Sequence, residues 1–515
     1  MAASQPGWRN LAVVIAVAFV LRAWQPGQMQ IEHFDEGVYA SNLLTGHLGN
    51  AYPDQHLYSP PLFPSLLEWT VILGGGNPQA PLWLNVILGT ALAAAVYQVA
   101  KEWFDVSTAM TAGLLVATSD FAIWFSRAAL TDTPLCLWLV LGLLFGSKAI
   151  RGGNWIWLLL SALCGALAWW TKYNGWLPGA ILVAGTCGWW LFERRGIQDL
   201  RGPVFRAALI ATGMFLCWLP LPSMLAPHGG YAAVASNHKG YFVGLSGWWN
   251  SFQAQLAVAA HLAGPVTLGG IATAWAVLTW NRKDDQTATS KTVDSIPQWI
   301  LAAWIISLLV AIPLYRPYPR LQLPLQIGAC LLVAKWLTLL SRIKLSHWSR
   351  PCWGLAVFAG IPLFGVQFTA WESRTGLQRA AESVRQSVNQ ELANLPASQV
   401  PEYDCLLYVL AEPGLFYHLA SHAGEDIRDF VQPAGNLGML DSAQLDKRLP
   451  NFLITGPHAH RDHPELLQDN PGLPGLQRLA SWPYTPSELV LLDDVPPSQL
   501  TSHREQLVQL WLISP

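Results

Sequence analysis

The strongest constraint on this chain is a series of long apolar runs separated by short polar loops. A helix that crosses a bilayer needs about 17–25 mainly apolar residues, and about eleven runs meet that need. Only 12% of the residues are charged, against about 25% in soluble domains, so the chain cannot cover several soluble domains with a polar surface. The runs lie near 9–24, 81–100, 107–125, 133–150, 155–172, 176–192, 204–221, 256–280, 297–314, 321–340 and 351–370. The sequence therefore predicts a polytopic α-helical membrane protein.

The charge balance limits the classes of partner that the chain can bind. The 30 Lys and Arg residues nearly cancel the 32 Asp and Glu residues, for a formal net charge of -2. This balance removes the electrostatic basis of nucleic-acid binding. The 27 Trp residues fit a membrane partner instead, because Trp concentrates where apolar tails meet water. We expect a membrane and no nucleic acid.

The Lys and Arg residues of the loops predict the orientation, because the richer side of a membrane protein faces the cytoplasm. Loops on one side carry Arg9, Lys101, Lys148, Arg151, Arg194, Arg195, Arg201, Arg206, Arg282, Lys283, Lys291, Arg342, Lys344 and Arg350. Loops on the other side carry only Arg22, Arg127, Lys172, Lys239, Arg316 and Arg320. We therefore place the N-terminus in the cytoplasm, with the first run as a signal-anchor helix. With an odd number of spans, residues 371–515 lie outside.

The predicted outer tail, residues 371–515, has an ordinary polar composition with short apolar strings. Tyr403–Leu410, Asn451–Thr455 and Glu488–Leu492 are each bounded by Pro, Gly or Asp, as strands are. Ser373–Leu395 has apolar residues at helical spacing, and Ala411–Ala420 is a second candidate helix. We expect two domains: a transmembrane domain over 1–370 and a small extracytoplasmic α/β domain over 371–515.

The first outer segment, residues 22–80, is long and carries adjacent acids directly after the first span. His33 precedes Asp35 and Glu36, and the two runs Gly37–Leu44 and Leu62–Leu73 are short and amphipathic. Such helices lie along a membrane surface. Adjacent acids at a helix end have no simple packing use, so Asp35 and Glu36 are functional candidates.

The other predicted outer loops add one acid and several cations on the same face of the membrane. These residues are Arg127, Asp132, Lys172, Arg316 and Arg320. Ionisable residues at the ends of membrane helices are functional candidates. An acidic cluster opposite several cations suits an anionic substrate attacked by a deprotonated nucleophile. The alternative is a set of helix-end salt bridges and side chains that reach toward the interface.

The ordered motifs resemble a known family. An Asp-Glu pair follows the first span in HFDEGVYASNLLTGHL, and PPL, SRAALTDTPL, LAWWTKYNGWLPG and YRPYPRLQLPL come later. Together, over roughly the first 370 residues, they resemble the protein O-mannosyltransferase and aminoarabinose-transferase (PMT/ArnT-like) family of GT-C glycosyltransferases. The resemblance implies a GT-C fold and inverting transfer of a sugar from a polyprenyl-phosphate donor to an acceptor hydroxyl outside the membrane. The tail shows no β-trefoil repeat of the eukaryotic enzymes, which favours a bacterial plasma (inner) membrane.

The chemistry of such a transfer fits these residues. A leaving phosphate needs no protonation, so one base and several cations suffice. By the resemblance, Asp35 is the base and Glu36 orients it or holds the acceptor. Arg127, Lys172 and Arg320, followed by Arg316, are the expected phosphate contacts. Supporting residues are Asp132, which would fix its loop, His33, and Tyr315 and Tyr318, which would flank the sugar or phosphate or belong to the interfacial aromatic belt.

Metal binding and other functions remain as alternatives. The resemblance implies no required metal, but His33, Asp35, Glu36 and Asp132 offer hard ligands for Mg²⁺ or Mn²⁺. The tail histidines 458, 460 and 463 lack a second ligand group at zinc-site spacing, which favours a polar loop. A flippase, a GT-C ligase or polymerase using pyrophosphate-linked glycans, and a tethered binding module are the competing functions. A transporter is disfavoured because the acids lie at helix ends and the halves of the chain do not repeat.

Overall fold

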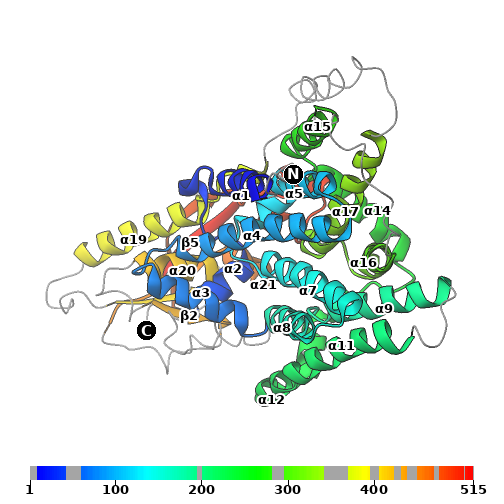
Figure 1. Ribbon diagram of the computed structural model, residues 1–515. Coiled ribbons are helices and arrows are strands. Elements are labelled where there is room, and N and C mark those ends of the chain that lie inside the picture. Colours follow the sequence, from blue (N-terminus) through cyan, green and yellow to red (C-terminus); the bar gives the residue numbers. More distant parts are fainter. Residues whose placement is uncertain are drawn as a thin grey trace. The chain divides into compact units, whose positions relative to one another are not determined.

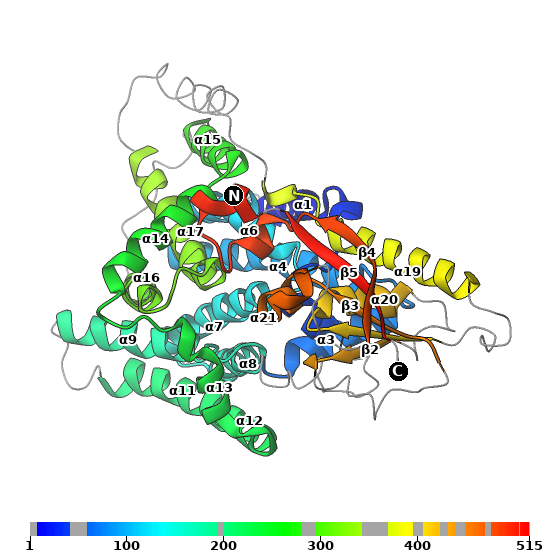
Figure 2. The ribbon, with the colours of Figure 1, turned by 180° about the vertical axis from the view of Figure 1, so that it is seen from behind.

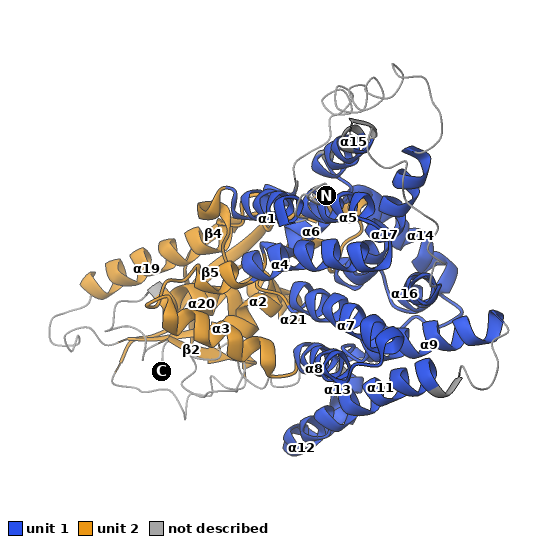
Figure 3. Ribbon diagram, in the orientation of Figure 1, with its two compact units in different colours: residues 1–24, 85–127, 131–371 blue, residues 25–84, 128–130, 372–515 orange. Residues whose placement is uncertain are grey.

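The structure is a computed structural model that describes residues 8–41, 59–193, 200–280, 295–341, 369–394, 405–422, 431–437, 449–468, 475–503 and 505–513. Its elements group into two compact units, coloured separately in Figure 3. Unit 1 comprises Met1–Trp24, Asn85–Arg127 and Thr131–Trp371. Unit 2 comprises Gln25–Leu84, Ala128–Leu130 and Glu372–Pro515. The first outer segment thus groups with the tail, whereas the sequence assigned it to the transmembrane domain; the predicted domains stay a prediction.

The regular elements described in unit 1 are helices, and an isolated β-bridge joins Phe242 and Tyr315. Figure 1 shows α7, α8, α9 and α11 running alongside one another, and these helices pack in pairs. The helices are α1 (Trp8–Ala23), α4 (Ala80–Trp103, whose first residues group with unit 2), α5 (Val106–Ala117), α6 (Asp120–Ser126), α7 (Asp132–Gly152), α8 (Trp155–Thr171), α9 (Leu177–Phe192), α11 (Phe205–Trp218), α12 (Pro220–Leu225), α13 (Gly230–His238), α14 (Trp248–His261), α15 (Pro265–Trp280), α16 (Ile296–Ala311) and α17 (Pro319–Ser341).

The predicted apolar runs coincide with these helices from the first run to the tenth. The last run, 351–370, lies almost wholly outside the described residues. By length and composition, the described residues hold 5 helices able to cross a membrane, or up to 7 if each of two bent pairs is one span. The chain is therefore a multi-pass membrane protein. Several other predicted spans, such as α8, α9 and α11, form shorter apolar helices or parts of longer ones.

Two predicted spans are broken rather than straight. Helices α5 and α6 meet at 59°, and α14 and the following helix meet at 76°. The first break is set by Ser119, whose hydroxyl accepts from the backbone N–H of Ala122 and so starts a new helix. At the second break Pro265 opens α15, and proline suits the first helical position. The Asp120 carboxylate joins the two breaks by accepting from the N–H and hydroxyl of Thr267, at 2.7 and 2.8 Å.

A buried arginine satisfies the carbonyls that the first break exposes. Arg22, near the end of α1, is fully buried and donates to the carbonyls of Val116 and Ala117, each at 3.1 Å. Its Nε donates to the Ser126 hydroxyl at 3.1 Å. Carbonyls at a helix end need partners where water is absent, so Arg22 stabilises the bend.

Unit 2 contains a mixed sheet of five strands in the order β2-β1-β3-β5-β4, visible from behind in Figure 2. Strand β1 (Leu406–Leu410) pairs in parallel with β2 (Val431–Ala434) and β3 (Asn451–Thr455). Strand β5 (Gln506–Ile513) pairs antiparallel with β3 and with β4 (Leu476–Tyr484). The described helices of at least four residues are α2 (Phe34–Ala40), α3 (Leu62–Leu73), α19 (Gly376–Asn394), α20 (Pro413–His422), α21 (Pro457–Asp462) and α22 (Glu488–Leu491), with the 3-10 turns η11 (Pro464–Leu467) and η12 (Pro497–His503).

The predicted α/β character of the tail is confirmed, with one wrong element. The strands at 406–410 and 451–455 and the helices α19 and α20 lie where the sequence predicted them. Glu488–Leu492, predicted as a strand, instead forms helix α22. An apolar run this short cannot distinguish the two periods, and the backbone N–H of Glu488 is held by the Glu372 carboxylate at 2.8 Å. The sequence also missed β2, β4 and β5.

The two short helices predicted in the first outer segment have different environments. Helix α3 has the predicted bounds and exposes Trp69, Ile72 and Leu73, as a surface helix does. Helix α2 is buried from Asp35 to Ala40, so its predicted place along a membrane surface is wrong. It packs on α20 so closely that a Cβ on Gly37 would lie 2.2 Å from the backbone nitrogen of Gly414. Only glycine fits at that contact.

Candidate active site

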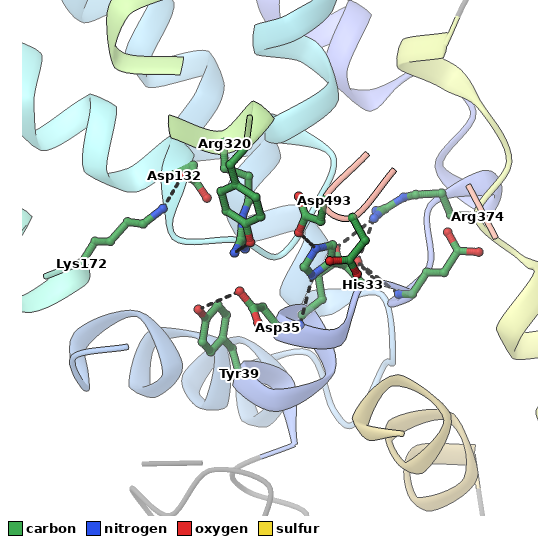
Figure 4. A network of polar contacts seen from close by, with 12 residues as sticks. His33, Asp35, Tyr39, Asp132, Lys172, Arg320, Arg374 and Asp493 are labelled. Atoms are coloured by element: carbon green, nitrogen blue, oxygen red, sulfur yellow. Dashed lines mark hydrogen bonds and ion pairs between the residues drawn. The ribbon is translucent and has the colours of Figure 1, made fainter. Parts of the chain in front are cut away.

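The acidic segment, residues 32–36, lies in unit 2 and begins helix α2. The His33 side chain caps the helix by accepting from the N–H of Asp35 at 3.1 Å. Asp35 and Glu36 occupy the first turn, where the helix dipole favours negative charge. Figure 4 shows this turn with its polar contacts. The local sequence thus places both acids at the start of a capped helix.

Glu36 is fully buried, and its carboxylate is surrounded by donors. Both of its oxygens accept from Nη1 of Arg374, at 3.0 and 2.9 Å. The backbone N–H groups of Glu32 and His33 donate to one oxygen at 3.1 and 2.9 Å, and that of Ala129 donates to the other at 2.6 Å. Removing the charge of Glu36 would leave these donors with weaker partners. Glu36 therefore fixes the acidic segment.

Glu32 is a second buried acid in this segment, and its surroundings are different. Its carboxylate accepts from the hydroxyls of Tyr484 and Ser487. Burial raises the pKa of Glu32, although the two hydroxyls and Arg374 oppose the rise. Burial and the Glu32 carboxylate together raise the pKa of Tyr484 well above its usual range. These contacts bind the acidic segment to the tail.

Asp35 differs from its two neighbours in what surrounds its carboxylate. It is 9% exposed, and the hydroxyl of Tyr39 donates to its Oδ2 at 3.5 Å. Tyr39 follows Asp35 by four residues and so lies on the same helix face. Asp35 thus combines a backbone fixed by the cap with a side chain held by a long hydrogen bond.

The cationic loops, residues 126–134, 171–174 and 315–320, lie in unit 1 except for residues 128–130. Lys172 Nζ forms an ion pair with Asp132 Oδ1 at 2.5 Å, drawn in Figure 4. The Lys172 side chain is 19% exposed and that of Asp132 is 1% exposed. The other oxygen of Asp132 is buried and has no hydrogen-bond partner among the described residues. The ion pair with Lys172 is a contact through which Asp132 would hold its loop, as the sequence predicts.

The loop 315–320 holds its arginines against tyrosine rings. The Arg316 guanidinium lies 4.0 Å from the ring centroid of Tyr241, and that of Arg320 lies 4.8 Å from the ring centroid of Tyr318. Arg320 also donates to the Tyr318 hydroxyl. Cation–π contacts of this kind hold a guanidinium while preserving its charge. Tyr315 packs edge-on against Phe242 instead.

Arg127 is buried, and its guanidinium contacts the backbone. Its Nη1 donates to the carbonyl of Arg22 at 2.8 Å and to the carbonyl of Trp24. Only 3% of the residue is exposed. These contacts hold the chain where it leaves α1, so Arg127 has a structural role that the sequence did not predict. Its contact with phosphate stays a prediction.

The candidate metal ligands do not come together in the described residues. There, no group of three or more His, Cys, Asp or Glu side chains could hold a metal ion. Glu36 makes a poor ligand because both oxygens already accept from buried donors. In the tail, His458 pairs with Glu412 at 3.0 Å, whereas His460 bonds to Thr455 and His463 to Glu465. The three histidines have separate partners, but the predicted loop is wrong, because His458 and His460 lie on helix α21 and His463 caps its end.

The sequence thus identified the residues of two described clusters but missed their partners. Unit 2 holds His33, Asp35 and Glu36, whereas unit 1 holds the candidates of the cationic loops. The expected meeting of the two sets stays a prediction. The missed partners are Arg374, Asp493 and Tyr39. Helical spacing from Asp35 could have identified Tyr39, but no local signal marks Arg374 or Asp493, both far along the chain.

The fold resembles that of solved glycosyltransferases. ArnT from Cupriavidus metallidurans in the apo state has 15% sequence identity and a TM-score of 0.56, with 98% of each chain covered. The same protein bound to undecaprenyl phosphate gives a TM-score of 0.55 at 15% identity, again over 98% of each chain. An oligosaccharyltransferase from Archaeoglobus fulgidus in the apo form, 12% identical, gives 0.52 over 88% of this chain and 70% of that one.

A segment of the sequence matches the model of a known protein family. Residues 58–220 match the family model of dolichyl-phosphate-mannose-protein mannosyltransferases. The chain is a membrane glycosyltransferase that resembles the PMT/ArnT type over this segment. A comparison with curated proteins found no match. The matched segment contains Arg127, Asp132 and Lys172, whereas Asp35 and Arg320 lie outside it. The predicted resemblance to this family and the predicted enzyme class are thereby confirmed.

Proposed function

We propose that this enzyme transfers a sugar from a polyprenyl-phosphate donor to a hydroxyl acceptor, with inversion at the anomeric carbon. Two observations on similar proteins support the donor. The matched family is named for dolichyl-phosphate mannose, and the ArnT structure of similar fold is bound to undecaprenyl phosphate. In both names the sugar carrier is a polyprenol with one phosphate. The acceptor is a hydroxyl of a lipid, a glycan or a protein.

The surroundings of Glu36 support the assignment of Asp35, its neighbour in the motif, as the base. Glu36 is surrounded by five buried hydrogen-bond contacts, so taking up a proton would weaken all of them. Asp35 lies in the same turn, and the Tyr39 hydroxyl donates to its Oδ2 at 3.5 Å. Asp35 takes the proton of the acceptor hydroxyl as the hydroxyl oxygen attacks the anomeric carbon. The bond from that carbon to the phosphate oxygen breaks, and the polyprenyl phosphate leaves as an anion.

The cations stabilise the charge that develops on the leaving phosphate. Lys172 is the leading candidate, because Asp132 accepts from only one of its three N–H donors in the described contacts. Arg320 and Arg316 follow, since their contacts with tyrosine rings leave the guanidinium charge intact. Arg127 is the last candidate, because its Nη1 is already bound to backbone carbonyls.

The reaction and the tail are assigned to the outer side of the membrane. The support is the distribution of Lys and Arg among the predicted loops, which places residues 371–515 outside. Single cysteines at Arg461 and Lys291, in a chain without its own cysteines, test the orientation. A membrane-impermeant maleimide applied to intact cells should label the Arg461→Cys variant alone. Labelling of the Lys291→Cys variant alone would contradict it.

A donor panel tests the function directly. The purified enzyme is incubated with dolichyl-phosphate mannose, undecaprenyl-phosphate-linked sugars and the matching pyrophosphate-linked sugars, and products are identified by mass spectrometry. We expect release of the polyprenyl monophosphate, and no release with the Asp35→Asn variant. Turnover on pyrophosphate donors alone would favour the ligase alternative instead. We further propose that no metal is required, so excess EDTA should leave the rate unchanged; loss of activity that Mg²⁺ or Mn²⁺ restores would contradict this part.

A further inference from the structure

The cap of the Asp35 helix is connected to the far end of the chain. His33 Nε2 contacts the Asp493 carboxylate, which lies just beyond α22 in the tail, and both residues belong to unit 2. The other ring nitrogen, Nδ1, accepts from the backbone N–H of Asp35 at 3.1 Å. Both side chains are largely buried, at 6% and 12% exposure. Figure 4 shows this chain of contacts from Asp493 through the imidazole to Asp35.

These two contacts define the tautomer of His33. A backbone N–H can only donate, so Nδ1 must carry a lone pair. A neutral imidazole then carries its proton on Nε2, which donates to the Asp493 carboxylate. The carboxylate cannot donate when ionised, so it favours the same arrangement from the other side. Asp493 therefore keeps the ring in the tautomer that the helix cap requires.

We propose that Asp493 is a positioning residue for glycosyl transfer, acting through His33 on the backbone of Asp35. The inference rests on the proposed role of Asp35 as the base. The cap bonds to the N–H of the catalytic residue itself, so a change in the ring tautomer moves the residue that removes the proton. A small displacement of a catalytic group costs rate even when the substrate still binds.

The charges around His33 favour this role over that of a simple tether. The Glu36 carboxylate accepts from the backbone N–H of His33 at 2.9 Å, and Arg374 neutralises that carboxylate from the tail. Glu32, the next residue back, also donates its N–H to Glu36. The main-chain position of the segment is therefore fixed without Asp493. What Asp493 adds is the ring tautomer.

The ring of Phe34 adds a further tail contact beside the cap. It lies 4.8 Å from the ring of His458, which in turn pairs with Glu412 at 3.0 Å. These groups meet Phe34 rather than the imidazole of His33. Within the described contacts, the groups that face His33 are therefore Asp493 on Nε2, the N–H of Asp35 on Nδ1, and Glu36 on the backbone.

Protonation of His33 has a specific consequence. A proton on Nδ1 turns the acceptor into a donor, which then faces the donating N–H of Asp35. The cap is then lost, and kcat should fall at acid pH for this reason. An Asn at position 33 keeps a capping oxygen and has no proton to gain.

The experiment compares Asp493→Leu, His33→Asn and the double variant in the purified full chain, with the polyprenyl-phosphate donor on which the wild type turns over. The matched control is Asp494→Leu, which removes the neighbouring acid that pairs with exposed Arg461 at 3.5 Å. We expect Asp493→Leu to lower kcat by about three- to thirty-fold, the equivalent of a lost N-cap, with the donor KM unchanged. His33→Asn should leave only the acid limb that the Asp35 base itself produces, and the double variant should match it.

Three outcomes would overturn the inference. One is that Asp493→Leu behaves like Asp494→Leu in kcat and in pH profile. Another is that it lowers kcat equally in the His33→Asn background, as a tether would. The third is equal hydrogen exchange of the 33–40 amides in Asp493→Leu and the wild type, a readout that needs no substrate. Full turnover of Asp35→Asn would instead overturn the proposed function, and with it the catalytic meaning of the cap, whatever the exchange data show.

Discussion

The acidic segment and the cationic loops manage their charges in different ways. In the acidic segment, Glu36 is neutralised by Arg374 and by backbone donors, out of contact with water. In the cationic loops, Lys172 retains partial exposure, and the Arg320 guanidinium lies against the ring of Tyr318. A fully surrounded charge stabilises a fold, whereas a charge held on one side is able to meet a ligand. By this criterion Glu36 has a structural role, whereas the cations of the loops are able to bind a ligand.

Neutralising the two adjacent acids in turn tests whether Asp35 is catalytic and Glu36 structural. Asp35→Asn should lower turnover by about 10²–10⁴-fold, the usual contribution of a general base, and leave the unfolding temperature unchanged. Glu36→Gln should lower the unfolding temperature, because its buried donors lose a charged acceptor. Turnover assays and thermal unfolding in detergent measure both. Wild-type turnover in Asp35→Asn, together with an unchanged unfolding temperature in Glu36→Gln, would reverse the assignment.

Removal of the partner of Glu36 should give the next largest effect. Arg374→Met leaves a buried carboxylate without its cation, which costs about 3–5 kcal/mol of unfolding free energy. The double variant with Glu36→Gln should recover part of that loss, since no uncompensated charge remains. Denaturation in mixed micelles measures both variants against the wild type. A single variant as stable as the wild type would show that the pair does not hold the acidic segment.

A smaller effect is expected from the cationic loops. Lys172→Ala should raise the donor KM by about tenfold, because one charge-assisted contact with phosphate contributes about 1.5–3 kcal/mol. Lys148→Ala is the matched control, since that lysine pairs with Glu102 at 3.5 Å in a loop predicted for the opposite side. Steady-state kinetics at varied donor concentration separate the two. Equal donor KM values for both variants would remove Lys172 from the phosphate contacts.

The smallest effect concerns the pH dependence of stability. Burial raises the pKa of Glu32, so the folded state binds this proton more tightly than the unfolded state. The contribution of Glu32 to stability is therefore present below its unfolded pKa of about 4.3 and is lost as pH rises toward the folded pKa. The slope is at most about 1.4 kcal/mol per pH unit. Glu32→Gln should flatten unfolding curves in that range; an unchanged slope would assign it to other groups.

Much of the fold could be predicted from local pattern. The apolar runs located most helices of unit 1 but missed α13, and the bounds of α3 and β3 were predicted to the residue. The bends after Ala117 and after His261 were missed, because Ser119 and Pro265 lie inside continuous apolar stretches. The strands β2, β4 and β5 were missed because pairing along a sheet, not local composition, decides such short segments. Helix α22 was mistaken for a strand because so short an apolar run does not distinguish the helical period from the strand period.

The sequence by itself determined the class of the molecule, since membrane spans need only length and apolarity, and its ordered motifs pointed to Asp35 and Glu36. Only the tertiary structure decided how those two acids differ. Arg374 and Asp493 lie more than 330 and 450 positions along the chain from them. Contacts across such distances depend on how the tail folds over α2, and no local pattern records them. The different roles of the two neighbouring carboxylates therefore follow from the groups around each one, and only the folded chain brings those groups together.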